Sequence, residues 1–284
     1  MVSLYDHLID PTEPGSARGL GFELVYGYTD RDGLLKYLLP SRSLRMNSWS
    51  LMNDPRETKR WELAGTWNTS GALGRNDVPT RVDQLLRRSA RLLSASRDRA
   101  PQDAATSSFL FHRGWAKAPL WHFYGDAHRG ACLVLDFSEL NAELAGMPMS
   151  SSRRWRGMGS VEYEDRPARV ELSGSFATVR DVDDAVDEYL NHQGAIVELH
   201  LQKTTDWSYE NEARIICVDF DLPATEFDQP LDGLPIGQAL KAVILGDAHD
   251  DPSGSAQSIR KHLGSGMAVM RCSWADGRPR LEVL

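Results

Sequence analysis

The stretch DWSYENEARIICVDF, residues 206 to 220, begins with charged and aromatic residues and ends as an apolar run. The run from Ala213 to Phe220 has the length and the aliphatic, β-branched composition of a buried strand. Glu210 and Glu212 stand two residues apart at its start, and Arg214 follows two residues later. The stretch therefore predicts a buried strand with a polar cluster at its mouth.

Similar apolar runs lie on both sides of this stretch and alternate with helical patterns, which predicts one mixed α/β or α+β domain over residues 1–284. Two segments rich in Gly, Ser and Pro, 65–79 and 145–160, are interpreted as loop insertions within that domain. Strands are predicted at 22–28, 43–48, 130–137, 194–201, 213–220, 241–246 and 267–274, and helices at 30–41, 80–96, 179–193 and 254–265.

The composition excludes several classes of protein. A net charge of -8, with acidic residues spread along the chain, argues against general binding to nucleic acid. One basic segment, 150–160, is either a solvated loop or a loop that contacts phosphate. No apolar stretch approaches the roughly 20 residues of a membrane span, and the N-terminus lacks a signal-peptide pattern. We therefore expect a cytoplasmic protein that does not bind membranes.

Common catalytic and metal-binding signatures are absent from the sequence. It contains no GxGxxG, GxxxxGK[ST], HExxH or GxSxG pattern. His122 and His128 do not have a standard ligand spacing, and the three cysteines, Cys132, Cys217 and Cys272, each lie in an apolar run without a CxxC. No metal site and no disulfide are expected.

The Glu210 and Glu212 pair supports two interpretations. In an extended chain both side chains point to one face with Arg214, at a separation of about 7 Å. Like charges at that distance raise the pKa of one carboxyl, while Arg214 can keep the other ionised, which gives the pair separate roles. The alternative is a surface ion-pair ladder worth less than about 1 kcal/mol. The local pattern leaves both open.

Two further segments combine polar residues with aromatic ones. Asn53, Asp54 and Pro55 precede Glu57, and form either a turn with a helix N-cap or part of a site. The segment 106–137 carries a hydroxyl cluster, an aromatic group and a histidine before an apolar strand. It is either a strand edge with a packed aromatic corner or a second part of the same site. Its polar and aromatic candidates are Thr106, Ser107, Ser108, Trp121, Tyr124 and His128.

Taken in order, these segments resemble the bacterial family catalogued as domain of unknown function twenty-nine seventy-one. The most specific motif is K-x-x-x-W-x-Y-E-x-E-x-R, and it is accompanied by N-D-P-x-E and by L-W-x-x-Y-x-x-x-H-x-G. The chain also has the aromatic first strand, the serine-containing segment and the late AVILG strand of that outline. The matching residues are Tyr26, Tyr28, Asn53, Asp54, Pro55, Glu57, Ser107, Ser108, Leu120, Trp121, Tyr124, His128, Gly130, Val161, Tyr163, Lys203, Trp207, Tyr209, Glu210, Glu212 and Arg214.

The order of elements is also similar to the ADP-ribosyltransferase superfamily. That resemblance implies an α+β fold with split, mostly antiparallel sheets flanked by helices. It implies NAD as substrate, and an active site that combines a first-strand Arg or His, a second strand bearing serine or tyrosine, and a late Glu in an E-x-E motif. The first strand here reads VYGYTD, with no Arg or His. The corresponding positions would be Tyr26 or Tyr28, Thr106 to Ser108, and Glu210 with Glu212.

The leading hypothesis is an enzyme that binds NAD or a related nucleotide and cleaves or transfers at its ribose. Glu212 is the expected ribose-contacting carboxylate, Glu210 its partner and Arg214 the orienting ion. The acceptor would be water, a protein or a small molecule. Two alternatives remain: a non-catalytic nucleotide sensor or interaction module, for instance in phage defence, and a tailoring enzyme acting on a nucleoside-like molecule. The expected nucleotide-binding residues are Tyr26, Tyr28, Asn53, Asp54, Ser107, Ser108, Trp121, Tyr124, His128, Lys203, Trp207 and Tyr209.

Overall fold

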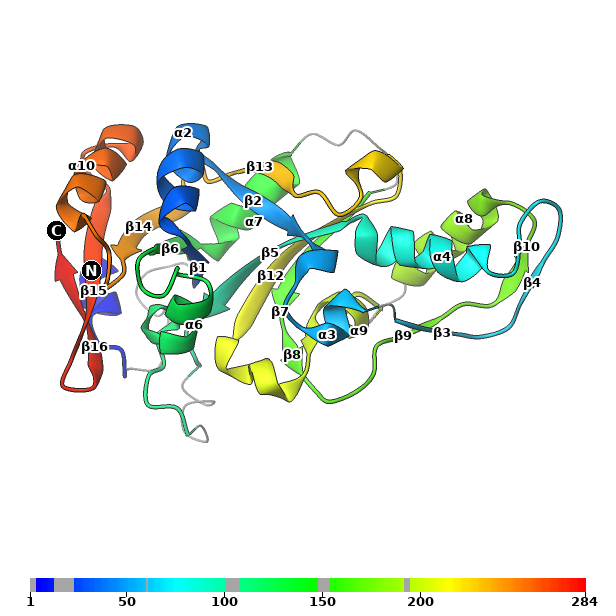
Figure 1. Cartoon of the computed structure of the whole chain (residues 1–284), viewed down its shortest axis with the longest axis horizontal. Coiled ribbons are helices and arrows are strands. Elements are labelled where there is room, and N and C mark those ends of the chain that lie inside the picture. The colour runs from blue at the N-terminus through cyan, green and yellow to red at the C-terminus, as the bar shows by residue number, and fades with distance from the viewer. Residues whose placement is uncertain (1–3, 13–22, 60, 101–107, 148–153, 192–194) are drawn as a thin grey trace.

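The structure is a computed structural model, shown in Figure 1, which describes residues 4–12, 23–59, 61–100, 108–147, 154–191 and 195–284. A curled, mostly antiparallel sheet of ten strands runs through the molecule, and helices pack on it. The strands of this sheet are β1 (Leu24–Thr29), β2 (Ser43–Ser48), β5 (Ala90–Arg97), β6 (Ala131–Asp136), β7 (Arg154–Ser160), β12 (Glu212–Asp219), β13 (Leu231–Pro235), β14 (Leu240–Leu245), β15 (Ala268–Ala275) and β16 (Arg278–Val283).

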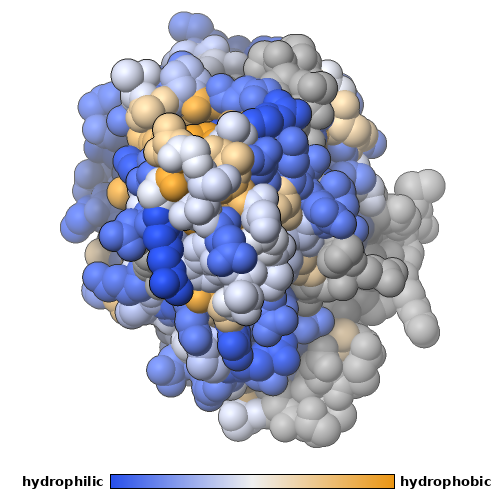
Figure 2. Space-filling view, turned by 90° about the vertical axis from the view of Figure 1, so that its right-hand side faces the viewer, coloured by the Kyte–Doolittle hydropathy of each residue, from blue (hydrophilic) through white to orange (hydrophobic). Residues whose placement is uncertain are grey.

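Three two-stranded parallel ladders lie outside the main sheet. They are β3 (Glu62–Ala64) with β9 (Arg169–Glu171), β4 (Trp67–Thr69) with β10 (Gly174–Phe176), and β8 (Glu162–Tyr163) with β11 (Gln202–Lys203). Figure 2 shows the end of the molecule that carries β4, β10 and α8 (Val179–Asn191), where most of the surface is hydrophilic and a small apolar patch interrupts it. The exposed Val179 belongs to this end.

The remaining helices are short. The α-helices are α1 (Leu4–Leu8), α2 (Leu39–Ser41), α3 (Pro55–Thr58), α4 (Asp77–Asp83), α6 (Ala118–Phe123), α7 (Phe137–Gly146), α9 (Ala195–His200) and α10 (Pro252–Leu263). Short segments of 3₁₀ or π helix are η1 (Gly33–Leu38), η2 (Trp49–Leu51), η3 (Gln84–Arg88), η4 (Gly114–Ala116), η5 (Thr205–Glu210) and η6 (Ala224–Glu226).

The sheet splits along one edge of β5. The other edge of β5 pairs with β12 from Ala90 to Ser96. Strand β12 in turn pairs with β7. On the split edge of β5, Arg91 and Leu92 pair with β2, and Ser96 and Arg97 pair with β1. None of the described strands therefore pairs with β5 on this edge between Leu93 and Ala95. From β2 the sheet continues to β13, and from β1 it continues through β6, β14 and β15 to β16.

Both faces of the sheet are covered, which explains why the central strands are continuous apolar runs. On β5, Leu92 belongs to a cluster with α4 and α8, whereas the adjacent Leu93 packs against a second cluster formed with η1, α7 and α10. A third cluster lies under α6, where Tyr26 of β1 packs with Trp121. The three cysteines are free and buried, as their apolar surroundings predict.

Most predicted elements are confirmed within a few residues, but two are wrong. The helix predicted over 80–96 ends at Arg88, and the second half of that segment is strand β5. Adjacent Leu92 and Leu93 match a helical spacing, yet they point to opposite faces of the sheet. The strand predicted at 194–201 is helix α9, because a short apolar run does not separate the two states by periodicity.

The two segments predicted to be loop insertions contain regular structure. Segment 65–79 includes β4 and the beginning of α4, with Leu73 and Val78 buried against α8. In segment 145–160, residues 148–153 lie outside the described part of the chain, and the remainder forms the end of α7 and strand β7.

Ile216 tests how far the fold depends on the β5–β12 pair. It is completely buried, pairs with Leu92 and packs into the cluster with α4 and α8. Ile216→Ala should lower the free energy of unfolding by about 2–5 kcal/mol in urea denaturation. The exposed Val283→Ala is the control and should change it by less than about 0.5 kcal/mol. Equal effects of the two substitutions would contradict this description of the core.

Candidate functional site

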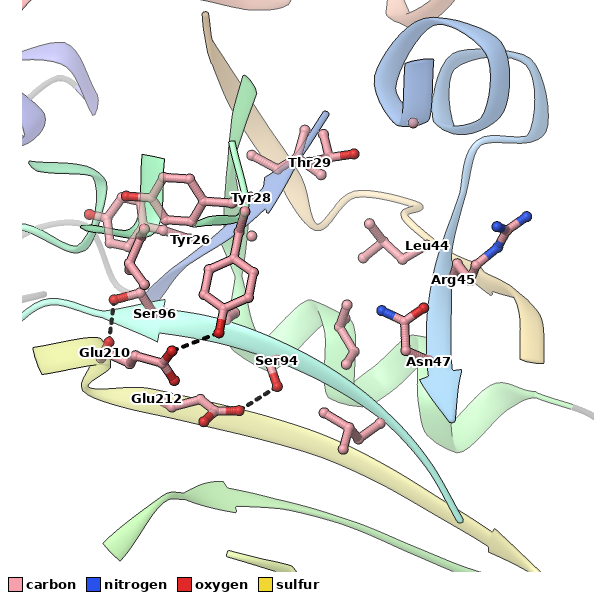
Figure 3. Close-up of a pocket in the computed structure, with 18 of the residues that line it drawn as sticks. Tyr26, Tyr28, Thr29, Leu44, Arg45, Asn47, Ser94, Ser96, Glu210 and Glu212 are labelled. Carbon is pink, nitrogen blue, oxygen red and sulfur yellow. Dashed lines mark hydrogen bonds between the residues drawn. The ribbon is translucent and has the colours of Figure 1, made fainter. Parts of the chain in front are cut away.

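The gap between β1 and β2 opens into a cleft of about 570 Å³. Its wall consists of β1, the split edge of β5 and β2, and α6 and η2 contribute to its rim. Figure 3 shows Glu210 and Glu212 on one side of this cleft and Arg45 and Asn47 of β2 on the other. Its polar and aromatic lining comprises Tyr26, Tyr28, Thr29, Asp30, Tyr37, Ser43, Arg45, Asn47, Asn53, Glu57, Ser94, Ser96, Phe123, Tyr124, Lys203, Glu210 and Glu212.

Ser94 marks the centre of the split edge. Alternate residues of a strand direct their backbone N–H and C=O groups to opposite edges. The N–H of Arg97 donates to the carbonyl of Asn211 on the β12 side, at 2.8 Å, so Ser94 faces the opposite edge. Because neither β1 nor β2 pairs at this position, the backbone groups of Ser94 are directed toward the cleft. The side chain of Ser94 is exposed there and donates to Glu212.

Glu210 and Glu212 reach the cleft through a turn rather than along an extended strand. Glu210 ends the 3₁₀ helix η5, and β12 begins only at Glu212. Between them Asn211 has a left-handed backbone, with φ of 45°, which asparagine tolerates well. The side-chain amide of Asn211 donates to the carbonyls of Arg97 and Asp98, at 3.2 and 3.0 Å, and holds the turn. The prediction of alternating faces is therefore wrong before Glu212, although both carboxylates line one cleft.

Glu212 is held as a carboxylate by contacts on both oxygens. Arg214 donates to Oε1 through Nε at 2.6 Å and to Oε2 through Nη2 at 3.0 Å. Ser94 also donates to Oε1, and Lys203 Nζ lies 3.1 Å from Oε2. Burial opposes ionisation, but Arg214 and Lys203 outweigh it and lower the pKa of Glu212 to about 2. Glu212 is thus a permanent anion at neutral pH.

Glu210 has a different environment. Tyr124 donates to its Oε1 at 2.9 Å, and Lys203 donates to its Oε2 at 2.6 Å. Burial raises the pKa of Glu210 and the charge of Glu212 adds to the increase, against the attraction of Lys203. The two carboxylates therefore differ in their tendency to take up a proton, as one of the two interpretations of the sequence expects.

The backbone around Glu210 is fixed from below by a buried amine. Lys117 Nζ donates to the Glu210 carbonyl at 2.9 Å and to Ser96 Oγ at 2.7 Å. Burial lowers the pKa of Lys117 well below its ordinary value. With both carboxylates at most 4% exposed, the cluster is not a surface ion-pair ladder.

Five predicted nucleotide-binding residues line the cleft: Tyr26, Tyr28, Asn53, Tyr124 and Lys203. Tyr28 is half-buried and donates to the Gly114 carbonyl at 2.7 Å. Asn53 donates to the hydroxyl of Tyr124 at 3.1 Å, which joins the N-D-P segment to Glu210. The sequence therefore predicts a large part of this wall.

Other predicted residues lie behind the cleft or away from it. Arg214 is buried beneath Glu212, and Asp54 is a buried N-cap that accepts from the Arg56 N–H at 2.8 Å. Trp121 packs edge-on under Tyr28, with ring centroids 5.2 Å apart. These three support lining residues rather than line the cleft themselves.

Four residues predicted to bind the nucleotide do not line the cleft. His128 stacks on the far side of Trp121, with ring centroids 6.0 Å apart, and Trp207 and Tyr209 of η5 do not line the cleft. Ser108 is exposed in a loop outside any strand, and Thr106 and Ser107 lie outside the described residues. The serines that line the cleft are Ser94 and Ser96 of β5.

Sequence reasoning missed Ser94, Ser96, Arg45 and Asn47 and did not assign Glu57 to the site. The alternation in LLSASR, residues 92–97, could have revealed the two serines, but the segment was interpreted as a helix. Arg45 and Asn47 alternate with buried Leu44 and Met46 along β2, a pattern that also fits an ordinary surface strand.

Two features are absent from the described ranges. Among those residues, none of the helices combines the length and apolar character needed to cross a bilayer. The same part of the chain contains no group of three or more His, Cys, Asp or Glu side chains arranged to hold a metal ion.

Comparison with known families supports the motif assignment. A family model described as "Protein of unknown function (DUF2971)" matches residues 120–215. This stretch is similar to the family that the motifs predict, and it carries two of the three motifs. The DUF2971 stretch contains Tyr124, Lys203, both carboxylates and Arg214, whereas the N-D-P-x-E segment precedes it. No curated protein and no solved structure matches the chain.

The charge of Glu212 makes a prediction about stability. Because its pKa is lowered from 4.5 to about 2, ionised Glu212 stabilises the fold fully above pH 4.5, and this contribution is lost as the pH falls toward 2. The difference in free energy of unfolding between wild type and Glu212→Gln should therefore shrink as urea denaturation is repeated from pH 7 down to pH 3. A difference that stays constant or grows on acidification would contradict the assignment of a lowered pKa.

Proposed function

We propose that this protein binds NAD or a related nucleotide in the cleft and cleaves or transfers at the ribose bonded to nicotinamide. The observation that carries this proposal is the pair of buried carboxylates at the split of the sheet, one permanently ionised and one with a raised pKa. A cleft of about 570 Å³ is within the usual size of small-molecule sites.

Glu212 has the properties needed to stabilise a cationic transition state. When the bond between ribose C1′ and the nicotinamide nitrogen breaks, its electron pair leaves with the ring, which becomes neutral. Positive charge then develops on the sugar as in an oxocarbenium ion. A carboxylate that stays ionised in a buried site stabilises this charge without reorganisation. Arg214 and Lys203 keep Glu212 in that state and in a fixed position.

Glu210 suits the proton transfer that completes the reaction. An acceptor O–H or N–H must lose its proton as its new bond to C1′ forms, and a carboxylate with a raised pKa is a better base than Glu212. Tyr124 and Lys203 each bond to one oxygen of Glu210 and orient it. The roles are therefore divided between an electrostatic stabiliser and a general base.

The opposite side of the cleft offers groups for the rest of a nucleotide. Arg45 lies there beside Asn47, with its guanidinium 4.3 Å from the ring centre of Tyr37. The first strand, β1, has no Arg or His, so Arg45 provides a cation from β2 instead. Guanidinium groups bind phosphate well. The aromatic faces of Tyr28, Tyr37 and Phe123 also line the cleft, and Phe123 is 63% exposed at its rim. Such faces can stack on nicotinamide or adenine.

Release of nicotinamide from NAD tests this function. We expect the wild type to release nicotinamide, alone or with candidate protein or small-molecule acceptors. Glu212→Gln should reduce the rate by about 100- to 1,000-fold, since it removes the charge that opposes the oxocarbenium ion. Glu210→Gln should reduce transfer by a comparable factor of about 100 or more. Chromatography of nicotinamide at saturating NAD measures both.

The exposed Glu62→Gln is the matched control, and its rate should equal that of the wild type. Absence of release from the wild type under all acceptor conditions would reject NAD cleavage. Calorimetry then separates the alternatives: binding of NAD without release supports a nucleotide sensor, and no binding supports a different nucleoside-like substrate or an interaction module.

Arg45 gives a second test that depends on phosphate alone. Arg45→Ala should weaken NAD binding by about 10- to 100-fold, the usual worth of a charged hydrogen bond, and should leave nicotinamide riboside, which has no phosphate, unaffected. Lys36→Ala removes an exposed cation of η1 and is the control. If Arg45→Ala weakens both ligands equally, Arg45 does not contact phosphate.

A further inference from the structure

A third carboxylate, Glu57, lines the cleft and has no assigned role in the chemistry proposed above. It lies in α3, three residues after the N-cap Asp54, where a Glu side chain often reaches back to cap the helix. Here Oε2 of Glu57 accepts no hydrogen bond from the described residues, and the described partner of Oε1 is Arg214. Glu57 is nevertheless only 1% exposed, so the side chain is buried without serving as a cap.

The one charged contact of Glu57 in the described structure is shared. Arg214 Nη2 forms an ion pair with Glu57 Oε1 and also donates to Glu212 Oε2. This contact leaves Oε2 of Glu57 without any donor among the described residues. A buried carboxylate oxygen without a donor is costly, and functional sites are where such groups persist. Glu57 lines the cleft, but Oε2 itself has almost no exposed surface, so a ligand donor would reach it with a shift of the Glu57 side chain.

The charges around Glu57 indicate what kind of ligand group fits. Three carboxylates, Glu57, Glu210 and Glu212, face two cations, Lys203 and Arg214. When all are ionised, this group carries one excess negative charge. Burial raises the pKa of Glu57, and the charge of Glu212 adds to the increase. The region therefore favours a cationic or hydrogen-bond-donating group and repels an anion.

We propose that Oε2 of Glu57 accepts a hydrogen bond from the carboxamide N–H of a nicotinamide ring bound beside Glu212. This inference rests on the proposed function and deepens it by assigning a residue that selects the ligand. The oxidised nicotinamide ring combines a positive charge with an amide donor, and both match the region around Glu57. A ring that carries a carboxylate in place of the carboxamide has lost the donor and gained a repelled charge.

Two dinucleotides that differ only in this group provide the test. Affinities for NAD and for nicotinic acid adenine dinucleotide are measured by calorimetry on the wild type, Glu57→Gln and the exposed control Glu62→Gln. The wild type and the control should prefer NAD by about tenfold or more. In Glu57→Gln, the side-chain amide can both accept from a carboxamide and donate to a carboxylate. The preference should therefore fall by about tenfold, mainly through tighter binding of the nicotinic acid form.

A purely structural role, through Arg214, would change both affinities by the same factor in Glu57→Gln, and this result overturns the inference while leaving the proposed function intact. The wild type alone gives a second measurement that does not depend on folding of the variant. If it binds both dinucleotides equally well, the inference is also overturned. If it binds neither, the proposed function fails and the assignment of Glu57 to nicotinamide fails with it.

Discussion

The buried guanidinium of Arg214 is the interaction on which the site depends. It lies on β12, has no exposed surface, and holds Glu212 of its own strand and Glu57 of α3 at the same time. Its third nitrogen, Nη1, donates to the His200 carbonyl at 2.9 Å at the end of α9. One side chain thus joins α9 and β12 to α3, which is distant from both in sequence. Removing one partner from a buried ion pair costs about 3–5 kcal/mol, because the other charge is left unpaired.

The strands around Arg214 were predictable because a strand that is buried on both faces has a continuous apolar sequence. The run from Ala213 to Phe220 corresponds to β12, and the AVILG segment corresponds to β14. The polar cluster at the start of β12 was also predictable, because charged residues next to a buried strand are themselves buried and need partners of opposite charge. The apolar runs alone predict a mixed α/β or α+β domain, and the mostly antiparallel sheet was expected from the superfamily resemblance rather than from the runs.

The parts that were not predictable depend on contacts between distant segments. Leu92 and Leu93 indicated a helix, and only the pairing of β5 with β12 shows that they face opposite clusters. The turn at Asn211 was hidden because its left-handed backbone is fixed by the carbonyls of Arg97 and Asp98, more than 100 residues away. Ser94 was missed for the same reason, since its place at the split is a property of three strands together.

The split also has a mechanical consequence. Among the described residues, the two halves of the ten-stranded sheet are joined along the edge of β5 by two pairs, Val25 with Arg97 and Tyr26 with Ser96. A molecule in the cleft would touch β1 on one side and β2 on the other, and so would act as a cross-link between the halves. A bound molecule would therefore make the sheet more rigid, because its contacts would join β1 to β2 where strand pairing is absent. A ligand that binds only the folded state also stabilises that state.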